Sequence, residues 1–60
     1  MSEKLRVVLV DDGRSALARL ETVLRALESV EIVGTATDGA MAITVVKQKR
    51  PDLVLMDTSS

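Results

Sequence analysis

The chain of 60 residues contains no cysteine, no histidine and no aromatic residue. Without cysteine it can form neither a disulfide nor a thiolate metal site. The additional lack of histidine excludes a Cys/His zinc site, a Ser-His-Asp triad and an imidazole base. Base stacking on aromatic side chains is excluded as well. Any chemistry must therefore rely on carboxylates, hydroxyls and ammonium groups.

The charges of the two signs nearly cancel, because 8 basic and 9 acidic residues give a net charge of −1. Such a chain offers no basic field to nucleic acid or to an anionic membrane. Its apolar runs are too short for a signal peptide or a membrane span. We therefore expect an intracellular, cytoplasmic protein without direct contact to nucleic acid or membrane.

Three apolar runs predict three β-strands, at about residues 5–11, 31–37 and 52–57. The first and the last run are apolar at every inner position, which is typical of strands buried on both faces. The middle run is more polar, as an edge strand can be.

Two helices are predicted between these strands, at about residues 14–28 and 39–49. The first has one apolar stripe, formed by Leu17, Leu20, Leu24 and Leu27, and either Asp12 or Gly13 caps it. The second follows a capping Asp38, ends before Pro51 and packs inward through Ala42, Ile43 and Val46. Right-handed crossovers then predict an α/β fold over residues 1–60. This fold is the βαβαβ half of a doubly wound parallel sheet, with strand order 2-1-3 and one helix on each face.

Three carboxylates follow the two apolar strands, namely Asp11 and Asp12 after the first and Asp57 after the last. In the order 2-1-3 these strands are neighbours, and the crevice beyond their carboxyl ends is where open α/β sheets bind ligands. Carboxylates that gather there repel one another unless a cation lies between them. Mg²⁺ prefers oxygen ligands and commonly serves phosphoryl transfer. Helix capping and turn formation are the alternative roles for each Asp taken alone.

Three segments carry a family resemblance: Val7 to Asp12, EIVGTATDG at residues 31–39, and RPDLVLMD at residues 50–57. Together they resemble the N-terminal half of a response-regulator receiver domain of bacterial two-component signalling, which has a flavodoxin-like fold. The resemblance implies that Asp57 accepts a phosphoryl group from a histidine kinase or a small phosphodonor. It further implies that Asp12 binds Mg²⁺ directly and that Asp11 binds it mainly through water. By the same resemblance, the backbone carbonyl of Ser59 completes the protein ligands of Mg²⁺.

Complete receivers are about twice as long and have the strand order 2-1-3-4-5. By this resemblance the chain is a truncated receiver that keeps the phosphoacceptor module but lacks the switching half. We therefore expect a module that is not an enzyme and does not signal alone. Its own phosphorylation by a phosphodonor should be weak or absent.

The last strand would then expose an unpaired apolar edge, formed by Leu53, Val54, Leu55 and Met56. Such an edge favours a homodimer or a higher oligomer, with antiparallel pairing slightly preferred. One alternative function is a self-associating structural half-domain whose acidic site is vestigial. Another is a fragment of a Mg²⁺-dependent phosphotransfer enzyme of the haloacid-dehalogenase type, although a D-x-D arrangement is expected there and Gly13 follows Asp12.

Overall fold

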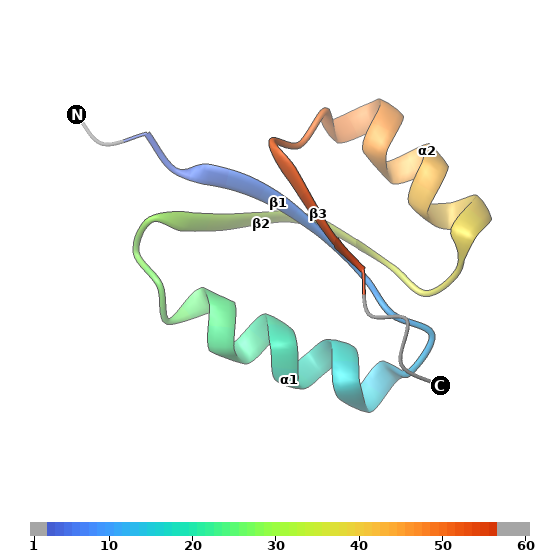
Figure 1. Ribbon diagram of the computed structural model, residues 1–60, viewed down its shortest axis with the longest axis horizontal. Helices are drawn as coiled ribbons and strands as arrows, with labels where there is room; N and C mark the ends of the chain where they lie inside the picture. The colour runs from blue at the N-terminus through green and yellow to red at the C-terminus, as the bar shows by residue number, and fades with distance from the viewer. Residues whose placement is uncertain (1–2, 57–60) are drawn as a thin grey trace.

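The computed structural model describes residues 3–56. These residues form five elements in the order β1 (Leu5–Val10), α1 (Arg14–Arg25), β2 (Val30–Ala36), α2 (Gly39–Lys49) and β3 (Leu53–Met56). The strands are parallel in the order β2-β1-β3, and the two helices lie on opposite faces of the sheet (Figure 1). The predicted α/β fold class, strand order and placement of the helices are confirmed.

The central strand β1 is buried on both faces. Val7, Val8 and Leu9 are at most 1% exposed and Val10 is 6% exposed. Successive side chains of a strand point to opposite faces, so β1 contributes to two cores. One core lies under α2 and the other under α1, where Leu17 is the buried helix residue. The uniformly apolar sequence of β1 therefore reflects its central position.

A β-bulge at Val33 divides β2 into two parts. Val7 pairs with Ile32 but Val8 pairs with Gly34, so Val33 is an extra residue in this strand. Because side chains alternate along a strand, one extra residue reverses which face the following residues cover. Beyond the bulge, Ala36 packs in the core under α2.

Helix α1 ends at Arg25, three residues before its predicted end at Glu28. The N–H groups of Ala26 and Leu27 donate to carbonyls three residues earlier, on Val23 and Leu24, which tightens the last turn and ends the helix. Leu27 therefore leaves the predicted apolar stripe and is 48% exposed.

Helix α2 begins as predicted, because the Asp38 carboxylate accepts a hydrogen bond from the Met41 N–H at 2.7 Å. The prediction that Ile43 packs inward is wrong, since this side chain is 59% exposed while Ala42 is 5% exposed. The helix lies over β1 and β2 and presents Ala42, Val45 and Val46 to the sheet. Ile43 instead lines an open groove between α2 and β3, together with Val54 and Met56.

Neither helix within residues 3–56 combines the length and the apolar character that a membrane span requires.

Candidate functional site

The carboxyl ends of β1 and β3 lie at the same edge of the sheet, where Val10 pairs with Met56. Asp11 follows Val10 directly, and its backbone N–H donates to the Ala36 carbonyl of β2 at 3.1 Å. This hydrogen bond holds Asp11 against the sheet, and the residue is only 5% exposed. Asp11 is the one charged residue among residues 3–56 that the fold buries.

The Asp11 carboxylate is oriented by the turn that leads into α1. Its Oδ1 atom accepts a hydrogen bond from the Gly13 N–H at 2.8 Å, which is the geometry of an Asx turn. Gly13 is the N-cap of α1 and has no side chain to bond to the helix. Of the two predicted caps, the structure therefore selects Gly13. The role of its amide was missed in the sequence, although an Asp followed two residues later by Gly is a signal for such a turn.

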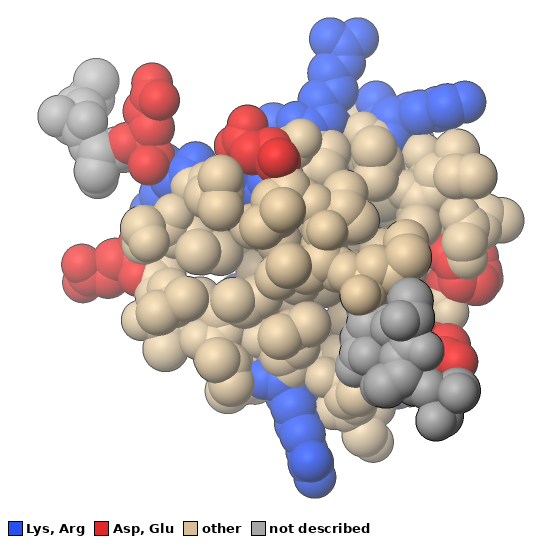
Figure 2. Space-filling view, in the orientation of Figure 1, with Lys and Arg blue, Asp and Glu red and all other residues tan. Residues whose placement is uncertain are grey.

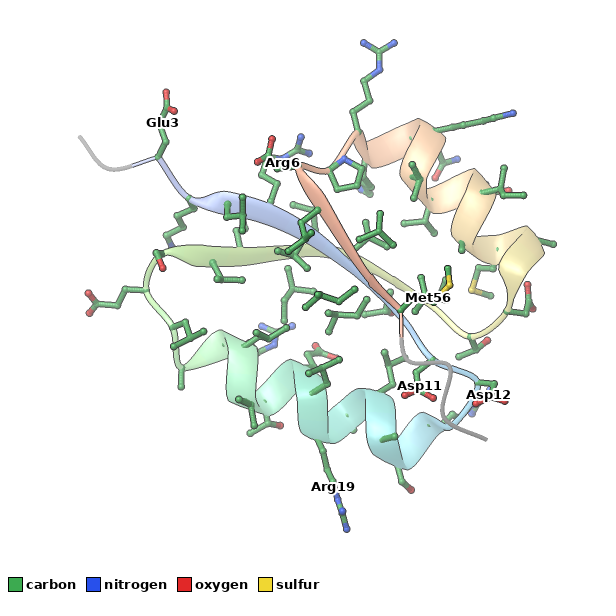
Figure 3. The ribbon with its side chains drawn as sticks, viewed as in Figure 1. Glu3, Arg6, Asp11, Asp12, Arg19 and Met56 are labelled. Atoms are coloured by element: carbon green, nitrogen blue, oxygen red, sulfur yellow. The ribbon has the colours of Figure 1, made fainter. Side chains whose placement is uncertain are left out.

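Asp12 lies between Asp11 and Gly13 and is exposed. Its side chain forms no hydrogen bond with any residue of the described range 3–56. Both carboxylates lie near the first turn of α1 and close to the end of β3 at Met56 (Figure 3). The structure thus brings Asp11 and Asp12 together at the predicted edge, one buried and one open to solvent.

A third acid on this side of the sheet, Asp38, does not join the pair. It follows β2, and its carboxylate caps α2 through Met41. Within residues 3–56, no three acidic side chains gather closely enough to hold a metal ion. The other predicted site residues, Asp57 and Ser59, lie outside the described residues.

Asp11 and Asp12 fit part of a Mg²⁺ site by the chemistry of their donor atoms. Both offer carboxylate oxygens, the ligands that this hard cation prefers. The hydrogen bond from Gly13 occupies one oxygen of Asp11 and fixes the orientation of the carboxyl group. Arg14 begins α1 at this edge, whereas α2 places Lys47 and Lys49 in its last turn, toward the start of β3. The edge is thus suited to a cation.

Comparison with known proteins identifies the family. Residues 7–59 match the response regulator receiver domain, which is most of the 60-residue chain. The chain belongs to the receiver domain family. Receiver domains are signalling modules that generally bind Mg²⁺ and typically interact with histidine kinases or phosphodonors.

Curated relatives of this receiver chain include three named protein-glutamate methylesterase/protein-glutamine glutaminase. The relative from Methanococcus maripaludis is 37% identical over 54 residues. Those from Geobacter metallireducens and Anaeromyxobacter dehalogenans are 40% and 42% identical, each over 53 residues. The matches cover 88–90% of the receiver chain but only 15–16% of each relative. The activities in these names therefore describe the relatives as whole proteins.

Proposed function

We propose that this receiver chain accepts a phosphoryl group on Asp57, with Asp11, Asp12, Asp57 and the backbone carbonyl of Ser59 as the protein ligands of Mg²⁺. The phosphoryl group would come from a histidine kinase or a small phosphodonor, in the cytoplasm. In this proposal the chain acts as a phosphoacceptor and not as an enzyme.

The pairing of β1 with β3 is the observation that carries the proposal. Val10 and Met56 are partners in this parallel pair, and each is followed in the sequence by an Asp. Parallel strands deliver the residues that follow them to one edge of a sheet, and this edge also holds Asp12. If each Asp served only to cap a helix or form a turn, the two would not be expected to follow paired positions of adjacent strands.

The reaction requires that Asp57 attack phosphorus with a carboxylate oxygen. An acyl phosphate forms, and the bond from phosphorus to the nitrogen or oxygen of the donor breaks, with the electron pair leaving on the donor. When Mg²⁺ is bound, it neutralises negative charge on the phosphoryl oxygens. The contribution of Asp11 is a carboxylate that the Gly13 amide already orients, so little freedom is lost when a cation binds.

The test is phosphorylation of the 60-residue chain with acetyl phosphate and Mg²⁺, followed by intact-mass spectrometry. We expect the mass of one added phosphoryl group in a small fraction of the unsubstituted chain and in none of the variant Asp57→Asn. Hydroxylamine should release the group, because it cleaves acyl phosphates. Phosphorylation that persists in Asp57→Asn would contradict the proposal.

The matched control is Asp38→Asn. Asp38 lies at the same edge of the sheet, and asparagine caps helices as well as aspartate does, so fold and phosphorylation should both be retained. Asp11→Asn tests the metal ligands separately. It should weaken Mg²⁺ binding in a titration followed by NMR, with the folded spectrum otherwise unchanged. Equal Mg²⁺ affinity in Asp11→Asn and the unsubstituted chain would exclude Asp11 from the site.

We propose self-association through β3 as a second function of the 60-residue chain, because the face around this strand is almost free of charge. Figure 2 shows this face, with the charged side chains gathered at its periphery. Three of the four strand residues are exposed, Leu53 by 40%, Val54 by 36% and Met56 by 58%. Light scattering over a concentration series tests this, and a mass that stays monomeric at all concentrations would contradict it.

A further inference from the structure

Three hydrogen bonds hold the start of β3 on a single residue of β1, Arg6. The Arg6 N–H donates to the Asp52 carboxylate at 2.9 Å, and the Arg6 carbonyl accepts from the Asp52 N–H at 2.8 Å. The guanidinium of Arg6 donates to the Arg50 carbonyl at 3.0 Å. Asp52 directly precedes β3, and Arg6 directly precedes Val7, the residue that pairs with Leu53. These bonds therefore fix the point at which β3 begins to pair with β1.

The apolar side chains of β3 do not fix this register by themselves. Side chains alternate between the faces of a strand, so a shift of β3 by two residues would leave each side chain on its own face. Such a shift exchanges one leucine for the other and valine for methionine, and all four are apolar. The register must therefore be set by residues at the ends of the strand. Of the two residues before β3, Pro51 has no N–H to donate, whereas Asp52 bonds through both its backbone and its side chain.

The register decides which residues meet at the carboxyl end of the strands. Val10 pairs with Met56, so Asp11 and Asp57 follow paired positions. A shift by two residues would displace position 57 along β1 by about 7 Å. The oxygen ligands of Mg²⁺ lie about 2 Å from the ion, so two of them are at most about 4 Å apart. A shifted β3 would thus remove Asp57 from a site that contains Asp11 and Asp12.

We propose that Asp52 is a positioning residue, because its carboxylate holds β3 in the register that places Asp57 beside Asp11. Asp52 acts from the opposite end of the sheet, since Arg6 precedes Asp11 by five residues, which is about 16 Å of strand. Figure 3 shows Arg6 at the start of β3 and Met56 at its other end. This inference deepens the proposed function and rests on it, since it concerns the position of the same Asp57.

Amide hydrogen exchange followed by NMR tests the role of Asp52 without metal or phosphodonor. Asp52→Ala removes the carboxylate and leaves the backbone bond to Arg6. We expect the amides that bond between β1 and β3 to exchange about two- to tenfold faster than in the unsubstituted chain, the factor that corresponds to one hydrogen bond. The Asp11 amide, which bonds to Ala36 of β2, should keep its rate. Asp52→Asn retains an acceptor oxygen and should restore slow exchange.

Gly34→Ala is the control for a general loss of stability. Its added Cβ would lie 2.6 Å from Cγ1 of Val45, a contact between β2 and α2 that does not involve β3. This variant should not speed exchange between β1 and β3 more than exchange between β1 and β2. If Asp52→Ala also speeds exchange in both strand pairs by the same factor, Asp52 contributes stability without holding the register, and the proposal is wrong.

A second measurement reports where β3 lies at the edge that holds Asp11 and Asp12. Mn²⁺ takes the same oxygen ligands as Mg²⁺, and as a paramagnetic ion it broadens the NMR signals of nearby amides. In the unsubstituted chain it should broaden the signals of the paired residues Val10 and Met56 together. In Asp52→Ala, Met56 should lose broadening relative to Val10, and Asp52→Asn should restore it. Equal broadening of both amides in all three chains would overturn the proposal.

A failure of the proposed function gives a different result. Mn²⁺ would then broaden neither amide of the unsubstituted chain, or Asp57 would not be phosphorylated, and neither result changes the exchange rates. Faster exchange confined to β1 and β3 in Asp52→Ala would still support the role of Asp52 in the register, whereas unchanged exchange would overturn it.

Discussion

The two edges of this sheet differ in length, shape and cover. Strand β2 has seven residues and a bulge, both helices pack against it, and Glu31 is its only exposed residue. Strand β3 has four residues and no bulge, and the helices pack mainly on β1 and β2. Three of the apolar side chains of β3 are exposed as a result.

Because of this difference, β2 should resist pairing with a further strand and β3 should favour it. Bulges and charged side chains are the usual means by which natural edge strands avoid association, and β2 has both. Strand β3 has neither within Leu53–Met56. The stability of the domain should therefore depend on β2, and its association on β3.

The largest expected effect on stability comes from Gly34→Ala in β2. A Cβ atom at this position would lie 2.6 Å from Cγ1 of Val45 on α2, so strand and helix must move apart. Overpacking of this kind costs about 1–3 kcal/mol. We expect the free energy of unfolding to fall by this amount in urea titrations followed by circular dichroism.

Two variants check that the cost arises from this contact. Gly39→Ala is the matched control, because nothing lies within 4 Å of the added methyl group and the residue is the first of α2. It should leave stability unchanged or raise it slightly. Val45→Ala should recover part of the loss when combined with Gly34→Ala. A Gly34→Ala chain as stable as the unsubstituted one would contradict the close packing of β2 and α2.

A smaller effect is expected where β3 begins. The Asp52 carboxylate accepts a hydrogen bond from the Arg6 N–H at 2.9 Å, and the Asp52 N–H donates to the Arg6 carbonyl at 2.8 Å. Asp52→Ala removes only the first of these bonds, at a cost of about 0.5–1.5 kcal/mol. The same urea titration measures it.

Asp52→Asn separates the hydrogen bond from the charge. The asparagine oxygen can still accept from Arg6, so this variant should retain most of the stability that Asp52→Ala loses. Equal losses in the two variants would show that the negative charge, and not the hydrogen bond, stabilises the start of β3.

The order of the elements could be predicted from the sequence because the pattern of apolar residues indicates which segments are buried, and on how many faces. Val7 to Val10 is uniformly apolar since β1 contributes to a core on each face, and this pattern already placed β1 at the centre. The bulge was not predicted, because it depends on how β2 pairs with β1, although an isolated Gly34 within a strand is a signal for one. The exposure of Ile43 was missed because it depends on how α2 lies across the sheet.

The site was predicted less completely than the fold. Asp11 and Asp12 were expected at the carboxyl end of β1 because residues that follow a central strand must emerge there. Which of them lies against the sheet and how its carboxylate is oriented depend on hydrogen bonds of Asp11 with Ala36 and Gly13, and composition does not record such bonds. The roles of Asp57 and Ser59 remain predictions from the family resemblance.

The smallest effect on stability, and the largest on association, should come from Val54→Lys. Val54 is 36% exposed, so lysine can extend into solvent and change the unfolding free energy of the monomer by less than about 0.5 kcal/mol. In a dimer two lysines would enter the apolar interface, and lysine on an edge strand opposes pairing. The molar mass should then be that of a monomer at concentrations where the unsubstituted chain associates.

Val23→Lys places the same change on α1 and should leave association intact. If Val54→Lys associates as well as Val23→Lys, the contact between chains does not use β3. The two edges then differ in exposure but not in their tendency to associate.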